Sequence, residues 1–162
     1  MQVGSIRFPA MDSSNGIGVE VYFAGCWREP KCKGCHNPEL WDMEAGTRYS
    51  PRALAETIDL IGDGVKQTLV LLGGEPLHQP ELPEFLALAR TAVDCIWLYT
   101  SYELEQVPES VRCLVDFIKT GSYMEDLRVE DKWLASENQK VWRKTEDGQW
   151  RTFYSTDHGY MY

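Results

Sequence analysis

Residues 17–35 read IGVEVYFAGCWREPKCKGC, and they combine a strand pattern with a cysteine motif. Every second residue from Ile17 to Phe23 is apolar, which is the two-residue period of a β-strand. From Gly25 onward the chain contains glycine, proline and three cysteines instead, and the alternation stops. The stretch therefore predicts a strand that ends immediately before a cysteine-rich loop.

A helix is predicted after this loop. Ser50 is a suitable N-cap and Pro51 a suitable first helical residue, and apolar residues then recur at helical spacing. Gly62 and Gly64 are expected to end the helix. It would cross back over the sheet to the next strand.

The following segments continue the alternation of strands and helices. Strands are predicted at residues 68–72, 95–99 and 114–118, and an amphipathic helix at 82–89. The wholly apolar run at 68–72 indicates a strand covered on both faces, and it breaks at the Gly-Gly-Glu-Pro sequence of residues 73–76. The sequence thus predicts an α/β protein with a mainly parallel sheet and right-handed crossovers.

Ligands of such sheets bind at the carboxyl ends of the strands. The cysteine loop, residues 73–76 and residues 100–101 each follow one of the predicted strands. We therefore expect these three loops to meet at one site.

Length and composition limit the class of protein. The 162 residues suit one domain, 1–162, and no stretch approaches the roughly 20 apolar residues needed to span a membrane. No apolar core of a secretory signal is seen near the N-terminus, so a cytoplasmic location is expected. The net charge of −9 disfavours nucleic acid as a partner and favours a protein or a small molecule.

Cys26, Cys32 and Cys35 lie within ten residues, which favours metal ligation over a disulfide framework. Soft thiolates suit zinc or an iron–sulfur cluster. A structural zinc site needs a fourth ligand, for which His36 is the near candidate. A cluster held by three cysteines instead leaves one iron open to a ligand that is not protein.

The Gly73-Gly74-Glu75-Pro76 sequence has two interpretations. Taken alone, it is a tight turn in which glycine permits positive φ and proline ends the strand. Beside an open iron, the same sequence would offer a ligand accessible backbone without side chains, together with one carboxylate that binds the ammonium of an amino-acid moiety. The two loops together fit S-adenosylmethionine (SAM).

A three-cysteine loop after one strand and Gly-Gly-Glu-Pro after the next resembles the radical SAM superfamily. The segments GVEVYFAGC, CKGCHNPELWD, LLGGEPL, IWLYTSYELEQV, VDFIKTG and ASENQKVW resemble, in order, the anaerobic (class III) ribonucleotide reductase activating proteins. Residues 133–142 lie outside the cofactor loops and point to that family in particular, although their apolar side chains also suit plain packing.

The resemblance implies a single-domain partial, open β/α barrel that binds a [4Fe–4S] cluster and SAM. Its activity would be reductive cleavage of SAM and generation of the reductase's glycyl radical, with a flavodoxin or ferredoxin as one-electron donor and no catalytic side chain beyond the cluster and SAM site. The implied roles are cluster ligation by Cys26, Cys32 and Cys35, adenine contact by Gly34 and His36, contact with the methionyl end by Gly73, Gly74 and Glu75, and ribose contact by Thr100; Cys35 also borders the SAM site.

The chain departs from the family pattern in two places. Five residues separate Cys26 from Cys32 where the family has three, and Ser-Asn-Gly-Ile-Gly at residues 14–18 stands where the family has Gly-Pro-Gly. Two added residues change the cost of loop closure little, and Pro30 limits their freedom. The cluster assignment therefore stands.

Two other functions remain open on the sequence. One is radical SAM chemistry on another glycyl-radical enzyme or a small molecule, and the other is a non-catalytic zinc or iron–sulfur binding module. Cys95 and Cys113 are expected to be small buried hydrophobic residues. His78 and His158 are expected to be ordinary loop histidines.

Overall fold

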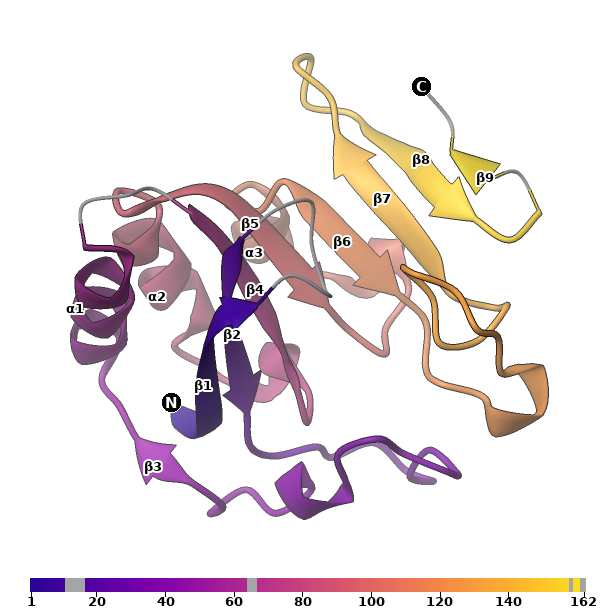
Figure 1. Ribbon diagram of the computed structural model, residues 1–162, viewed down its shortest axis with the longest axis horizontal. Coiled ribbons are helices and arrows are strands. Elements are labelled where there is room, and N and C mark those ends of the chain that lie inside the picture. The colour runs from indigo at the N-terminus through magenta and orange to yellow at the C-terminus, as the bar shows by residue number, and fades with distance from the viewer. Residues whose placement is uncertain (11–16, 64–66, 158, 161–162) are drawn as a thin grey trace.

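The computed structural model describes residues 1–10, 17–63, 67–157 and 159–160. These residues form a nine-stranded sheet in the linear order β3-β1-β2-β4-β5-β6-β7-β8-β9 (Figure 1). The strands are β1 (Gln2–Ala10), β2 (Gly18–Phe23), β3 (Thr47–Arg48), β4 (Gln67–Gly73), β5 (Val93–Tyr99), β6 (Phe117–Thr120), β7 (Lys140–Lys144), β8 (Trp150–Ser155) and β9 (Gly159–Tyr160). The α-helices are α1 (Pro51–Gly62), α2 (Leu82–Ala89) and α3 (Glu109–Arg112), and the short 3₁₀ helices are η1 (Pro38–Leu40), η2 (Pro76–His78), η3 (Leu104–Gln106) and η4 (Glu125–Leu127).

The centre of the sheet is parallel. Strand β2 pairs with β4, β4 with β5 and β5 with β6, all in parallel register. The strands predicted to end at Phe23, at residue 72 and at residue 99 are confirmed as β2, β4 and β5. The strand predicted at 114–118 begins later, at Phe117, because the chain is still leaving α3 at Leu114.

Both flanks of the sheet are antiparallel, so the sheet as a whole is mixed. Strands β1 and β3 extend it on one side, and β7, β8 and β9 on the other. The term "mainly parallel" therefore fits only the central four strands. The antiparallel strands were not predicted.

The predicted helices are confirmed, and they cover one face of the sheet (Figure 1). At the start of α1, the Ser50 hydroxyl accepts a hydrogen bond from the Ala53 amide at 3.2 Å, with Pro51 as the first helical residue. The helix ends at Gly62, followed by Asp63 in a left-handed conformation (φ 47°). Gly64, the other predicted terminator, lies outside the described residues.

The opposite face carries an aromatic cluster. The indole of Trp97 stacks between Phe117 at 4.2 Å and Trp133 at 5.3 Å (ring centroids), and Phe153 meets them edge-on. Trp133 comes from the segment between β6 and β7, which covers this face in place of a helix. The packing interpretation of residues 133–142 is thus confirmed for Trp133, which is buried.

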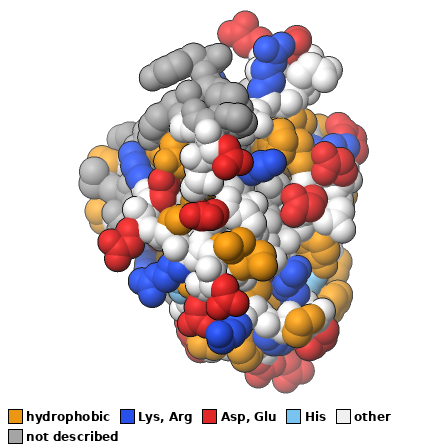
Figure 2. Space-filling model, turned by 90° about the vertical axis from the view of Figure 1, so that its right-hand side faces the viewer, with side chains coloured by type: hydrophobic (Ala, Val, Ile, Leu, Met, Phe, Trp, Pro, Cys, Tyr) orange, Lys and Arg blue, Asp and Glu red, His pale blue; other side chains and the backbone are white. Residues whose placement is uncertain are grey.

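Charged side chains of both signs are interspersed on the face that Figure 2 shows, with hydrophobic side chains between them. Among the described helices, none has the length and apolar character required to cross a bilayer.

Candidate cofactor site

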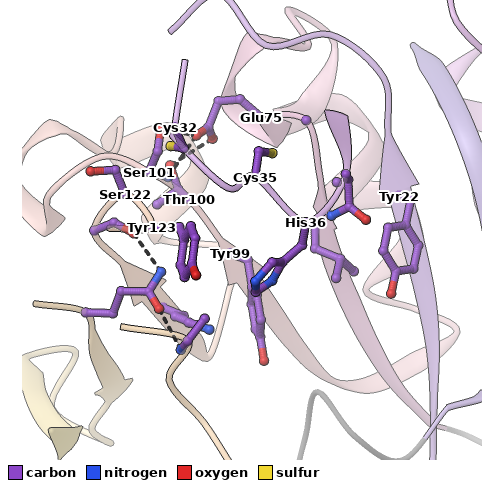
Figure 3. A pocket seen from close by; sticks show the side chains of 18 residues that line it. Tyr22, Cys32, Cys35, His36, Glu75, Tyr99, Thr100, Ser101, Ser122 and Tyr123 are labelled. Atoms are coloured by element: carbon purple, nitrogen blue, oxygen red, sulfur yellow. Dashed lines mark hydrogen bonds between the residues drawn. The ribbon is translucent and has the colours of Figure 1, made fainter. Parts of the chain in front are cut away.

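A cavity of about 320 Å³ lies at the carboxyl ends of β2, β4, β5 and β6 (Figure 3). Its walls come from the three predicted loops and from a fourth segment after β6. The predicted site residues that line it are Cys32, Cys35, His36, Gly73, Gly74, Glu75 and Thr100. Cys26 and Gly34 belong to the same cysteine loop but are not among the described lining residues.

The cysteine loop begins with two backbone hydrogen bonds to the last residue of η1 and to the residue after it. The Gly25 amide donates to the Leu40 carbonyl at 2.8 Å, and the Cys26 amide to the Trp41 carbonyl at 3.2 Å. Gly25 has a φ of 98°, which a residue with a Cβ rarely adopts. Burial raises the pKa of the Cys26 thiol. The first cysteine is thus held close to the end of β2.

The second half of the loop is a tight turn. The Cys35 amide donates to the Cys32 carbonyl at 3.2 Å, and the intervening Gly34 has a φ of 69°. A Cβ on Gly34 would lie 2.9 Å from the Glu125 carboxylate, which ends an exposed side chain that is able to move away. Glycine therefore suits this position because of its backbone conformation, and both cysteines of the turn line the cavity.

The cysteine loop also contacts the segment after β6. The His36 ring lies 4.6 Å from that of Tyr123, and the Lys33 ammonium forms an ion pair with Glu125 at 3.2 Å. In Figure 3, His36 extends toward Tyr99, while Cys32 and Cys35 lie nearer Glu75.

Two glycines, the last residue of β4 and the residue after it, allow two loops to approach one another. Gly73 has a φ of 113°, and a Cβ on Gly74 would lie 2.4 Å from the Gly25 carbonyl oxygen. The Glu75 amide donates to that same oxygen at 2.8 Å. The backbone of the Gly-Gly-Glu sequence thus packs directly on the start of the cysteine loop.

The Glu75 carboxylate joins this loop to the loop after β5. Its Oε1 accepts a hydrogen bond from the Thr100 hydroxyl at 2.8 Å, and its Oε2 accepts from the Ser101 amide and hydroxyl at 2.8 and 2.7 Å. Glu75 is only 1% exposed. Its carboxylate therefore organises the cavity wall, a role that the sequence did not reveal.

Lys119 is a lining residue that sequence reasoning missed. It is 8% exposed, and its ammonium lies 4.7 Å from the centroid of the Tyr99 ring. No hydrogen bond or ion pair to this ammonium is found within the described part of the chain. Burial lowers its pKa to about 8. A lysine at a strand end resembles a surface residue, so only the fold reveals this buried cation.

Three further predictions have outcomes here. His78 was expected to be an ordinary loop histidine, but it is 8% exposed and its ring bonds to Trp27 and Tyr102. Cys113 was expected to be buried and is exposed, whereas Cys95 is partly buried. Burial raises the pKa of Cys95 to about 11. His158 lies outside the described residues.

The donor set fits an iron–sulfur cluster in chemistry and place. The three thiols of the loop are free, and two of them face the cavity. Among the residues that the structure describes, no three His, Cys, Asp or Glu side chains are grouped closely enough to hold a metal ion. Cluster binding would therefore require the three sulfurs to draw together.

Comparison with known proteins points the same way. A family model described as a 4Fe-4S single cluster domain matches residues 14–142. The anaerobic ribonucleoside-triphosphate reductase-activating protein of Enterobacteria phage T4 is 32% identical over 153 residues, which cover 90% of this chain and 96% of that protein. The protein of the same name from Escherichia coli K12 is 30% identical over 148 residues, covering 83% and 95%. The one from Vibrio cholerae serotype O1 is 31% identical over 152 residues, covering 86% and 97%.

Proposed function

Because the chain belongs to the family of anaerobic ribonucleoside-triphosphate reductase-activating proteins and has a 4Fe-4S single cluster domain, we propose that it activates such a reductase by radical SAM chemistry. The observation that supports this most is the meeting of the cysteine loop, the Gly-Gly-Glu loop and Thr100 at one cavity. The linear nine-stranded sheet would then be an open, partial β/α barrel of the radical SAM type.

In this proposal Cys26, Cys32 and Cys35 hold the cluster, and its fourth iron faces the cavity. Free thiols with no fourth cysteine nearby support three-point ligation. His36, the candidate fourth ligand of a closed zinc site, packs its ring against Tyr123 instead. That contact favours an open iron over a closed zinc site.

SAM would occupy the cavity. Its methionyl end would meet Gly73, Gly74 and Glu75, its ribose Thr100, and its adenine Gly34 and His36. The Glu75 carboxylate already accepts hydrogen bonds from Thr100 and Ser101, so the bare backbone of the two glycines would supply much of the contact with the methionyl end. The aromatic ring of Tyr123 beside His36 offers the adenine a flat apolar neighbour.

When bound, the reduced cluster would give one electron to the SAM sulfonium, releasing methionine and a 5′-deoxyadenosyl radical that takes a hydrogen atom from a glycine Cα of the reductase. The task of this chain is then to hold SAM against the cluster and to limit the access of water. The electron would come from a flavodoxin or ferredoxin.

The test begins with anaerobic iron–sulfur reconstitution and electron paramagnetic resonance of the dithionite-reduced protein. We expect a [4Fe–4S] signal that changes when SAM is added, and loss of that signal in Cys35→Ala. With the cognate reductase and SAM, a glycyl-radical signal should then appear.

Each other outcome contradicts a specific part of the proposal. A colourless protein that holds one zinc ion, or a cluster that SAM does not affect, would favour the binding module. SAM cleavage without a radical on the reductase would favour another glycyl-radical enzyme or a small molecule as substrate.

A further inference from the structure

The segment after Glu75 supports the end of β2 through backbone and side chain. The Glu75 amide donates to the Gly25 carbonyl at 2.8 Å, and the Gln79 side-chain amide donates to the Ala24 carbonyl at 2.8 Å. Gln79 is itself 4% exposed, so its side chain lies within the packed interior. The residues just before Cys26 are therefore fixed.

The peptide group that follows Cys26 is held at both of its polar atoms. Its N–H, which belongs to Trp27, donates to Nδ1 of His78 at 3.0 Å. Its carbonyl oxygen, which belongs to Cys26, accepts from the Lys31 ammonium at 2.6 Å. Two side chains from different loops thus fix the orientation of one peptide plane.

The geometry also fixes the tautomer of His78. A backbone N–H can only donate, so Nδ1 must be the unprotonated nitrogen and Nε2 must carry the hydrogen. Nε2 lies 2.9 Å from the hydroxyl of Tyr102, to which it therefore donates. Burial lowers the pKa of His78, in keeping with a neutral ring.

The Trp27 indole covers the imidazole. The two ring centroids lie 5.0 Å apart with an angle of 22° between the ring planes, while Trp27 as a whole is 61% exposed. His78 is therefore shielded from solvent by the residue whose backbone it binds. Trp27 thus contacts His78 in two ways, through the hydrogen bond from its backbone N–H and through the stacking of the two rings.

We propose that His78 is a positioning residue for Cys26, the first cluster ligand. By fixing the peptide plane after Cys26, its Nδ1 sets the direction in which the thiol leaves the loop, and Tyr102 keeps the ring in the required tautomer. Five residues separate Cys26 from Cys32, so this wide loop needs such a restraint at its start. The inference rests on the proposed cluster role of Cys26.

Three substitutions separate the contacts. His78→Leu removes the acceptor, whereas the amide oxygen of His78→Asn lies two bonds from Cβ, as Nδ1 does, and retains it. Tyr102→Phe leaves the acceptor in place and removes only the partner of Nε2. Lys31→Met releases the other end of the same peptide group and leaves the buried His78 intact.

The first readout needs no cluster. Alkylation of the apoprotein with iodoacetamide, followed by peptide mass spectrometry, gives a rate for each thiol, with exposed Cys113 as the internal reference. We expect His78→Leu to raise the Cys26 rate about five- to tenfold and His78→Asn to return it to within about twofold of wild type. Lys31→Met should also raise the alkylation rate of Cys26, and Tyr102→Phe should raise it by a smaller factor.

The second readout is the reconstituted protein. We expect His78→Leu to bind less than half the iron of wild type and to give an altered paramagnetic resonance line shape, with both restored in His78→Asn. An unchanged Cys26 rate and an identical cluster signal in His78→Leu would overturn the inference. If His78→Leu does not fold, an unchanged Cys26 alkylation rate and an unchanged cluster signal in Lys31→Met would overturn the inference. A wild-type protein that binds no cluster would instead remove the proposed function.

Discussion

Lys119 carries a charge that its surroundings stabilise poorly. Its ammonium is buried at the end of β6 beside the Tyr99 ring, and its pKa falls to about 8 because of burial. Between pH 8 and 10.5 the unfolded chain therefore binds the proton more readily than the folded chain. Burial of the charged lysine therefore lowers the free energy of unfolding by its full amount below pH 8. This destabilisation decreases as the pH rises toward 10.5.

We predict that Lys119→Met raises the free energy of unfolding at pH 7 by about 2–3 kcal/mol, because a shift of one pKa unit corresponds to about 1.4 kcal/mol. The advantage over wild type should shrink as the pH rises from 8 to 10.5. Urea unfolding at several pH values measures both effects. Lys140→Met, at an exposed position in β7, should change stability by less than about 0.5 kcal/mol. A constant difference across this pH range would contradict the prediction.

Gly74 is the residue where the two cofactor loops leave no space for a side chain. We predict that Gly74→Ala lowers the free energy of unfolding by about 2–3 kcal/mol, because its Cβ would meet the backbone of Gly25 at 2.4 Å and that of Leu40 at 2.8 Å. Gly148→Ala is the control, since its φ of 79° is strained for alanine but nothing lies within 4 Å. The control should cost about 1 kcal/mol. Equal losses in both variants by urea titration would show that close approach is not the cause.

Sequence reasoning found the residues whose chemistry is local. Cys32, Cys35 and Glu75 stand in short motifs, and the structure places all three at the cavity. It missed His78, because the hydrogen-bond partner Trp27 lies 51 residues away in the sequence. It missed Lys119, because this side chain becomes buried only when the chain folds. Neither the partners nor the burial leaves a pattern in neighbouring residues.

At the level of elements, the buried parallel strands were predicted and the antiparallel flanks were not. Strand β4 contains the continuous apolar run of residues 69–72 and ends at Gly73, which is a strong signal. Strand β1 is half-buried or exposed at every residue except Val3, and its sequence has no clear alternation. Its pairing with β2 depends on tertiary contact, which single-segment patterns do not record.

One half-buried contact connects the helical layer with β5 and with the residue that precedes β6. At the end of α2, Arg90 forms a bidentate ion pair with Asp116, with distances of 2.5 and 2.9 Å, and Asp116 also accepts from the Ile96 amide in β5 at 2.8 Å. We predict that Asp116→Ala costs about 2 kcal/mol in unfolding free energy. Arg90→Ala should cost less than about 1 kcal/mol, because the arginine is 38% exposed and leaves the amide contact intact.

Thermal and urea unfolding of the two variants measure this difference. If Arg90→Ala is as destabilising as Asp116→Ala, the ion pair and not the amide contact is the main contribution.

Across the whole molecule, we predict a gradient of backbone protection from the centre of the sheet to its C-terminal flank. All six residues of β2 are buried, whereas β8 has mostly half-buried side chains. Amides of β2 and β4 should therefore exchange with solvent deuterium at least about 100-fold more slowly than those of β8. Hydrogen exchange with mass spectrometry measures this, and equal protection in the two regions would contradict it.

The sharing of one carboxylate by two loops has a consequence for engineering. A designer who transplants the Gly-Gly-Glu loop into another scaffold without Thr100 and Ser101 would leave the buried Glu75 carboxylate with the Leu77 amide as its remaining donor. The recipient would have to hydrate that carboxylate or distort the graft. These two loops are thus exchangeable only as a matched pair, and a chimera that replaces one of them should be less soluble than one that replaces both.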